Sequence, residues 1–177
     1  MEWFKKIFPN FLSVLRIVLL VPFVMALRAD DLTLSIVTVL TILATDFLDG
    51  KLARAWGSVS RTGKVLDPLS DKICTAVAGF GLIVYRSFPT WLLAVILIRD
   101  AIILSAGFML IRARHFVPVS DPVGRVSVGI ISAALIVYLL RLEALKGLAN
   151  AATVLVLVAS LLSYGRYFVL ALKRKAA

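Results

Sequence analysis

Six long apolar runs are the feature that most constrains this chain. They cover approximately residues 10–28, 32–50, 66–86, 89–111, 123–141 and 147–170. A helix rises roughly 1.5 Å per residue, so about 20 residues are enough to cross roughly 30 Å of hydrocarbon. The spanning segments must be helical because lipid offers backbone groups no hydrogen-bond partners. The runs therefore predict an all-α integral membrane protein with six transmembrane helices.

The composition agrees with a membrane protein and excludes several other classes. Hydrophobic residues make up 61% of the chain, charged residues 17%, and the mean hydropathy is +0.99. Soluble domains are only about 45–50% apolar. The single cysteine, Cys74, excludes an internal disulfide and a cysteine-rich metal site. The chain shows no linker and no internal repeat, so one transmembrane domain over residues 1–177 is expected.

The basic residues predict the orientation in the membrane. The net charge is +10, and 14 of the 20 Lys and Arg fall on one side of the predicted membrane, against 4 on the other. The positive-inside rule places both termini and the loop over residues 51–64 in the cytoplasm. In a bacterium this would be the inner membrane. Anionic membrane lipids, and not nucleic acid, are the expected partners of this charge. Residues 1–9 are expected to form a short helix in the membrane interface.

Four of the ten acidic residues lie within one stretch of 26 residues. Asp46 and Asp49 are three residues apart near the end of the second run, and Asp67 and Asp71 are four apart at the start of the third. Each spacing puts the two carboxylates on one face of a helix. The short connection makes the two helices neighbours. We therefore expect an active site at the cytoplasmic ends of the second and third helices.

The residue types in this stretch favour a metal-bound diphosphate. Four carboxylates cannot stay ionised together in a low dielectric without a cation, and oxygen ligands favour Mg²⁺ or Mn²⁺ over zinc. Two such ions would neutralise charge on a leaving group. Gly50 and Gly63 let a phosphate approach the backbone, Ala53 is also small, and the fork of Arg54 suits phosphate oxygens. Together these features suit phosphoryl transfer. The alternative is a belt of acids paired with neighbouring basic residues.

These residues read D-x-x-D-G-x-x-A-R-x8-G-x3-D-x3-D from Asp46 to Asp71. The pattern resembles the signature of the CDP-alcohol phosphotransferase family at all eight positions. The chain plan, about six membrane helices with the motif across the second and third, is similar as well. The segment from Pro9 to Arg16, Pro-Asn-Phe-Leu-Ser-Val-Leu-Arg, resembles the start of the phosphatidylglycerophosphate and cardiolipin synthase branch.

The resemblance implies a reaction and a set of roles. A phosphatidyl group would pass from CDP-diacylglycerol to an alcohol, with release of CMP, in phospholipid biosynthesis. Two divalent cations, Mg²⁺ or Mn²⁺, would be held by Asp46, Asp49, Asp67 and Asp71. The CDP part would be bound by Asp46, Gly50, Ala53, Arg54 and Gly63. Asp71 would also be the catalytic base for the acceptor hydroxyl, which requires it to be the least metal-bound carboxylate. Family members are commonly homodimers, so a homodimer is expected.

The expected acceptor is glycerol 3-phosphate, with phosphatidylglycerol as the alternative and an inositol phosphate as a more distant one. Lys64, Arg112 and Arg125 are candidates to bind an acidic acceptor, although the positive-inside rule alone would place basic residues there. Arg99-Asp100 stands where phosphatidylglycerophosphate synthases usually have Arg-Glu. The Arg-Asp version resembles the eukaryotic-type cardiolipin synthases.

Two further polar features lie inside the apolar runs. Arg16 follows Asn10 and Ser13 at three-residue steps, which favours lipid or phosphate contact, with snorkelling to the interface as the alternative. For Arg99 and Asp100 the favoured interpretation is an internal ion pair that fixes helix packing. Two other classes remain as alternatives. A membrane prenyltransferase would need two well-separated acidic motifs, and a divalent-ion transporter would need midplane polar groups in several helices.

Overall fold

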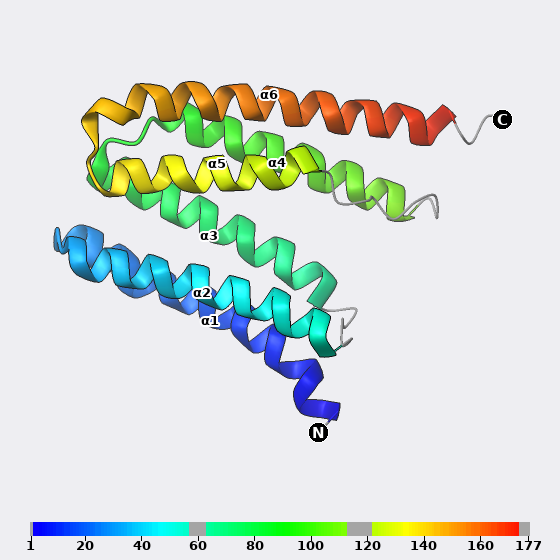
Figure 1. Ribbon diagram of the computed structural model, residues 1–177, viewed down its shortest axis with the longest axis horizontal. Coiled ribbons are helices and arrows are strands. Elements are labelled where there is room, and N and C mark those ends of the chain that lie inside the picture. Colours follow the sequence, from blue (N-terminus) through cyan, green and yellow to red (C-terminus); the bar gives the residue numbers. More distant parts are fainter. Residues whose placement is uncertain (1, 57–62, 113–121, 174–177) are drawn as a thin grey trace. The chain divides into compact units, whose positions relative to one another are not determined.

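In the part of the chain that it describes, the computed structural model contains six α-helices and no strand (Figure 1). The helices are α1 Glu2–Arg28, α2 Leu32–Trp56, α3 Gly63–Arg86, α4 Thr90–Arg112, α5 Pro122–Leu139 and α6 Glu143–Lys173. The structure describes the backbone of residues 2–56, 63–112 and 122–173, and the side chains of residues 11–12, 14–45, 48, 70–106 and 123–166. Every predicted apolar run forms a helix, which confirms the all-α prediction.

Two helix boundaries differ from the sequence-based prediction. The expected separate interfacial helix over residues 1–9 is wrong, because α1 runs continuously from Glu2 to Arg28. This stretch contains no glycine, and a proline within a membrane helix removes one hydrogen bond without ending the helix. The predicted loop over residues 51–64 is also shorter, because α2 continues to Trp56 and α3 begins at Gly63. Leucine, alanine, lysine and arginine dominate residues 51–54, and all four are strong helix formers.

The chain divides into two compact units, Met1–Ser87 and Phe88–Ala177. In the first unit α1 packs against both α2 and α3. Leu20, Phe23 and Leu27 recur on one face of α1 and are buried. On α3 a Cβ atom at Gly81 would lie 3.0 Å from Leu27 Cδ1, so the missing side chain lets these helices approach closely. Small residues commonly allow such close packing of membrane helices.

The turn between α1 and α2 is tied to the end of α3. Asp30 closes the turn in the left-handed region with φ 57°, a conformation that aspartate adopts more readily than most residues. Asp31 caps α2, because its Oδ1 accepts a hydrogen bond of 2.9 Å from the backbone N–H of Leu34. Arg86, at the end of α3, places Nη2 2.7 Å from Asp30 Oδ1. This ion pair fixes one end of the three-helix unit.

In the second unit α6 packs along α5 and also contacts α4. Tyr138, near the end of α5, joins the surrounding segments. Its ring meets Phe88 edge-on with centroids 4.8 Å apart, and its hydroxyl donates a hydrogen bond of 3.1 Å to Asn150 Oδ1 on α6. Lys146 Nζ lies 5.0 Å from the centre of the same ring. These contacts hold the start of α4 and the start of α6 against the end of α5.

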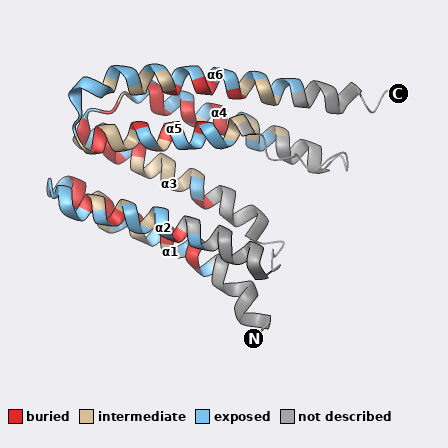
Figure 2. Cartoon of the chain, viewed as in Figure 1, coloured by how far each residue is buried: buried red, intermediate tan, exposed pale blue. Residues whose placement is uncertain are grey.

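Exposed apolar side chains lie along the helices of both units, and Figure 2 shows exposed positions on each described helix. Val18, Val21 and Met25 are 57–64% exposed on one face of α1, and Leu155 and Leu162 are 71% and 65% exposed on α6. Within the described residues, one helical stretch, Glu143–Arg166, is long and apolar enough to cross a membrane, and Leu32–Thr45 and Val123–Leu139 are shorter apolar stretches.

Candidate active site

The backbone places the acidic motif on two helices that share a neighbour. Asp46 and Asp49 belong to α2, Asp67 and Asp71 belong to α3, and both helices pack against α1. The side chains of Asp46, Asp49 and Asp67 lie outside the described residues. The same is true of the CDP-binding candidates Gly50, Ala53, Arg54 and Gly63. Of the four motif carboxylates, the structure describes the side chain of Asp71, so the site geometry is built from the surroundings of that residue.

Asp71 is paired with Arg16, 55 residues earlier in the chain. Arg16 Nη1 donates to Asp71 Oδ1 across the contact between α1 and α3. The Arg16 side chain is 3% exposed, whereas the Asp71 side chain is 52% exposed. Thr75 Oγ1 donates to the backbone carbonyl of Asp71 at 3.0 Å, one turn further along α3. The carboxylate of Asp71 therefore contacts a buried arginine between α1 and α3 while about half of its side chain is exposed.

Sequence reasoning singled out both Arg16 and Asp71 but did not pair them. Arg16 was expected to contact lipid or phosphate together with Asn10 and Ser13, whose side chains lie outside the described residues. The structure records a motif carboxylate as one partner of Arg16, and the lipid or phosphate contact stays a prediction. The alternative was that the Arg16 side chain extends to the membrane interface, whereas in the structure this side chain is buried between helices. The signal for this pair was an intramembrane arginine near the start of the first run, on the same predicted side of the membrane as the acidic motif.

The α2 face that carries buried polar residues leads towards the motif. Ser35, Thr38 and Thr45 are buried, and each hydroxyl donates to a carbonyl of its own helix at 2.6–2.7 Å. Their spacing places them on one stripe of α2. Asp49 continues this series in the sequence, four residues after Thr45. Small side chains with internally satisfied hydroxyls suit a tightly packed helix contact.

A second buried polar cluster lies in the second unit, on α4, α5 and α6. Arg99 Nη1 pairs with Asp100 Oδ1 at 2.7 Å, and both residues are 4% exposed. Arg99 Nε donates to Ser160 Oγ at 2.8 Å, and Nη2 donates to Ser127 Oγ at 3.3 Å. The internal ion pair predicted for Arg99 and Asp100 is therefore confirmed. Sequence reasoning missed the two serines, which were visible only as isolated hydroxyls within apolar runs.

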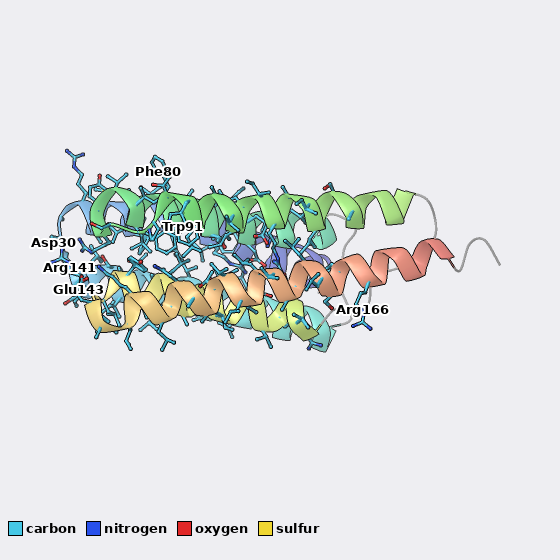
Figure 3. The ribbon with its side chains drawn as sticks, turned by 90° about the horizontal axis from the view of Figure 1, so that it is seen from above. Asp30, Phe80, Trp91, Arg141, Glu143 and Arg166 are labelled. Carbon is cyan, nitrogen blue, oxygen red and sulfur yellow. The ribbon has the colours of Figure 1, made fainter. Side chains whose placement is uncertain are left out.

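Of the three acceptor-binding candidates, the structure describes the side chain of Arg125. It is exposed near the start of α5, next to Gly124. A Cβ atom at Gly124 would lie 3.1 Å from Tyr164 Oη, so α5 and α6 approach closely there. Figure 3 shows Arg166 on α6 and, at the other end of that helix, Glu143. Lys64 and Arg112 lie outside the residues with described side chains.

The chemistry of the motif fits hard divalent cations. Its four candidate ligands are all carboxylates, the oxygen donors that Mg²⁺ and Mn²⁺ prefer. Within the described side chains no three His, Cys, Asp or Glu residues gather closely enough to hold a metal. Three of the four motif carboxylates are outside that set. Two ions therefore remain a prediction that rests on the donor types and on the half-exposed Asp71.

Comparisons with known proteins agree with the motif. A family model described as CDP-alcohol phosphatidyltransferase matches residues 6–164. A CDP-diacylglycerol–glycerol-3-phosphate 3-phosphatidyltransferase of Aquifex aeolicus is 32% identical over 133 residues, 72% of each chain. An enzyme of the same name from Mycoplasma pneumoniae is 30% identical over 67% of this chain and 61% of its own. A probable cardiolipin synthase (CMP-forming) of Drosophila melanogaster is 34% identical over 58% of this chain. The chain spans 32% of the length of the Drosophila protein and 61% of that of the Mycoplasma protein, which is less than two thirds of each.

Proposed function

Because the chain belongs to the CDP-alcohol phosphatidyltransferase family, we propose that it transfers a phosphatidyl group from CDP-diacylglycerol to an alcohol with release of CMP. The acceptor oxygen forms a bond to the phosphorus next to the diacylglycerol. The bond from that phosphorus to the bridging oxygen of the diphosphate breaks, and the acceptor proton leaves with a base. The observation that carries the proposal is the complete motif from Asp46 to Asp71, inside the region that matches the family.

The motif residues take the roles that this reaction needs. Asp46, Asp49, Asp67 and Asp71 would hold two divalent cations, which supply charge neutralisation at the diphosphate when bound. The CDP part would be held by the residues that follow on the same stretch, Gly50, Ala53, Arg54 and Gly63. Asp71 would accept the proton of the acceptor hydroxyl. The support from the structure is that its side chain is half exposed on α3.

The reaction requires the protein to meet a lipid donor, and the family consists of membrane enzymes. The proposal therefore includes six membrane-crossing helices, with both termini and the site on the cytoplasmic side, and a homodimer. Exposed apolar faces on α1 and α6 support contact with lipid. The surplus of basic residues on one side supports the orientation.

For the acceptor we propose glycerol 3-phosphate. The relatives that this chain covers over 72% and 61% of their length are named for that acceptor. Phosphatidylglycerol is the second candidate, because the Drosophila relative is named as a probable cardiolipin synthase, although the chain covers only 32% of its length. Arg125, which is exposed on α5, would help to bind an acidic acceptor together with Lys64 and Arg112.

The test supplies the purified full chain with CDP-diacylglycerol and Mg²⁺ or Mn²⁺. Separate reactions contain glycerol 3-phosphate, phosphatidylglycerol, inositol phosphate or no acceptor. CMP release is measured, and the lipid product is identified by mass. We expect phosphatidylglycerophosphate, with activity lost in EDTA and restored by the metal. A cardiolipin product would reassign the acceptor, and no CMP release with any acceptor would contradict the proposal.

A further inference from the structure

Two buried arginines tie α3 to its neighbours within the first unit, one near each end of that helix. Arg16 pairs with Asp71, and Arg86 pairs with Asp30. In both pairs the arginine side chain is 3% exposed, while the aspartate side chain is 52% or 60% exposed. The pairs thus match in chemistry and burial. The difference that matters here is that Asp71 belongs to the acidic motif, whereas Asp30 lies in the turn between α1 and α2.

A guanidinium inside a site for divalent cations needs an explanation. A cation at this place repels the ions that the motif is expected to gather, so helix packing alone would be served better by an apolar residue. Arg16 also engages Oδ1 of Asp71 directly. A carboxylate whose oxygen accepts from a guanidinium is restrained from turning both oxygens towards a metal ion. Asp71 therefore has one oxygen engaged by a guanidinium, unlike a carboxylate that serves only as a metal ligand.

We propose that Arg16 is a positioning residue that limits metal ligation by Asp71 and holds its carboxylate in the direction of the acceptor hydroxyl. This inference rests on the proposed function, in which Asp71 takes the acceptor proton. A base that lies beside two cations is weak when it is strongly metal-bound. Arg16 restrains Asp71 from that ligation by holding Oδ1 from the α1 side, which keeps the carboxylate available for the acceptor.

The first experiment measures metal binding without turnover. Mn²⁺ is titrated into the full chain in detergent, without substrate, and free Mn²⁺ is followed by electron paramagnetic resonance. We expect Arg16→Gln to bind Mn²⁺ about tenfold more tightly than the wild type, because a nearby positive charge is removed and Asp71 is released. The matched control, Arg86→Gln, loses a pair of the same kind at the other end of α3 and is expected to stay within about twofold.

Two results would overturn the proposal. One is unchanged or weaker Mn²⁺ binding in Arg16→Gln, including the case in which the wild type binds no Mn²⁺. The other is an equal change in Arg86→Gln, which would reduce both arginines to packing roles. The metal measurement needs no catalysis. If the wild type binds Mn²⁺ but releases no CMP with any acceptor, the proposed function fails, while the titrations still decide whether Arg16 limits metal ligation by Asp71.

Arg16→Lys addresses the case in which Arg16→Gln does not fold. Lysine keeps the buried cation for Asp71, and with it the fold, but a single ammonium lacks the planar fork that fixes a carboxylate. We expect kcat to fall about tenfold while the KM for CDP-diacylglycerol stays within about twofold. A variant that folds with the wild-type kcat would overturn the positioning role. Arg86→Lys, made in parallel, is expected to retain the wild-type kcat.

Discussion

At the residue scale, Asp71 has one side in the helix packing and the other open. Its partner Arg16 is buried, whereas its own side chain is 52% exposed. Substitution by asparagine keeps the shape and a hydrogen-bond acceptor for Arg16 but removes the charge. The change therefore separates the chemistry of the carboxylate from its volume.

We predict that Asp71→Asn lowers CMP release by at least about 100-fold, the size expected when a base is lost. The helix should persist, because its backbone hydrogen bonds, and the bond from the Thr75 hydroxyl to the carbonyl of residue 71, do not involve the carboxylate. Asp30→Asn is the control, because it alters the matching pair with Arg86 outside the motif. Asp30→Asn should retain activity within about twofold. Full activity in Asp71→Asn would refute the role of this carboxylate.

The sequence located the motif residues but not the contact between Arg16 and Asp71. A motif fixes spacing along one stretch, and spacing places neighbours on a helix face. The contact with Arg16 spans 55 residues and depends on how α1 and α3 are rotated and shifted against each other. The pattern of apolar residues does not specify that rotation to within one side chain. The same reason explains why Ser127 and Ser160 were not paired with Arg99 in advance.

At the element scale, the apolar runs predicted the number and order of the described helices correctly, but they predicted the helix ends less accurately. α4 begins at Thr90 and ends at Arg112, against the predicted 89–111. α2 runs six residues beyond the predicted end at residue 50. The length of an apolar run indicates how much of a helix can lie in lipid. The ends of the helix are set instead by the helix propensity of the flanking residues and by capping. The motif residues from Gly50 to Arg54 thus lie on a helix and not in a loop.

The packing of α1 on α3 depends on a missing side chain at Gly81. We predict that Gly81→Leu destabilises the protein by about 1–3 kcal/mol, because the new side chain must displace the buried Leu27. Gly129→Leu on α5 is the matched control, since nothing lies within 4 Å of a Cβ atom there. Thermal unfolding in detergent measures both variants. Equal effects of the two substitutions would show that Gly81 is not a close-packing position.

The network around Arg99 joins α4 to α5 and α6 through one guanidinium. We predict that Arg99→Leu costs about 3–5 kcal/mol, because it removes the cation that pairs with the buried Asp100. Arg99→Leu combined with Asp100→Leu should cost less than the single change, since both charges then leave the interior. Ser105→Ala is the control, because that exposed hydroxyl bonds only to carbonyls of its own helix. A double variant less stable than Arg99→Leu would contradict this account.

At the scale of the whole molecule, the proposal of six membrane crossings rests on the charges and the run lengths. Within the described residues one stretch, Glu143–Arg166, meets the criterion for a spanning helix. Six crossings require the turns after α1, α3 and α5 to face away from the cytoplasm. The connections after α2 and α4 and both termini then face towards it. Each turn away from the cytoplasm carries few basic residues, as the positive-inside rule demands.

Single cysteines test this topology. In a Cys74→Ser background, Ala29→Cys and Leu142→Cys report on the two turns, and Ser58→Cys and Ala176→Cys report on the opposite side. A membrane-impermeant maleimide is applied to right-side-out and inverted vesicles. We expect the first two cysteines to react only in right-side-out vesicles and the last two only in inverted ones. Positions 142 and 176 lie before and after α6, so labelling of both from the same side would show that α6 does not cross the membrane. That result would contradict six crossings and the proposed cytoplasmic side of the C-terminus.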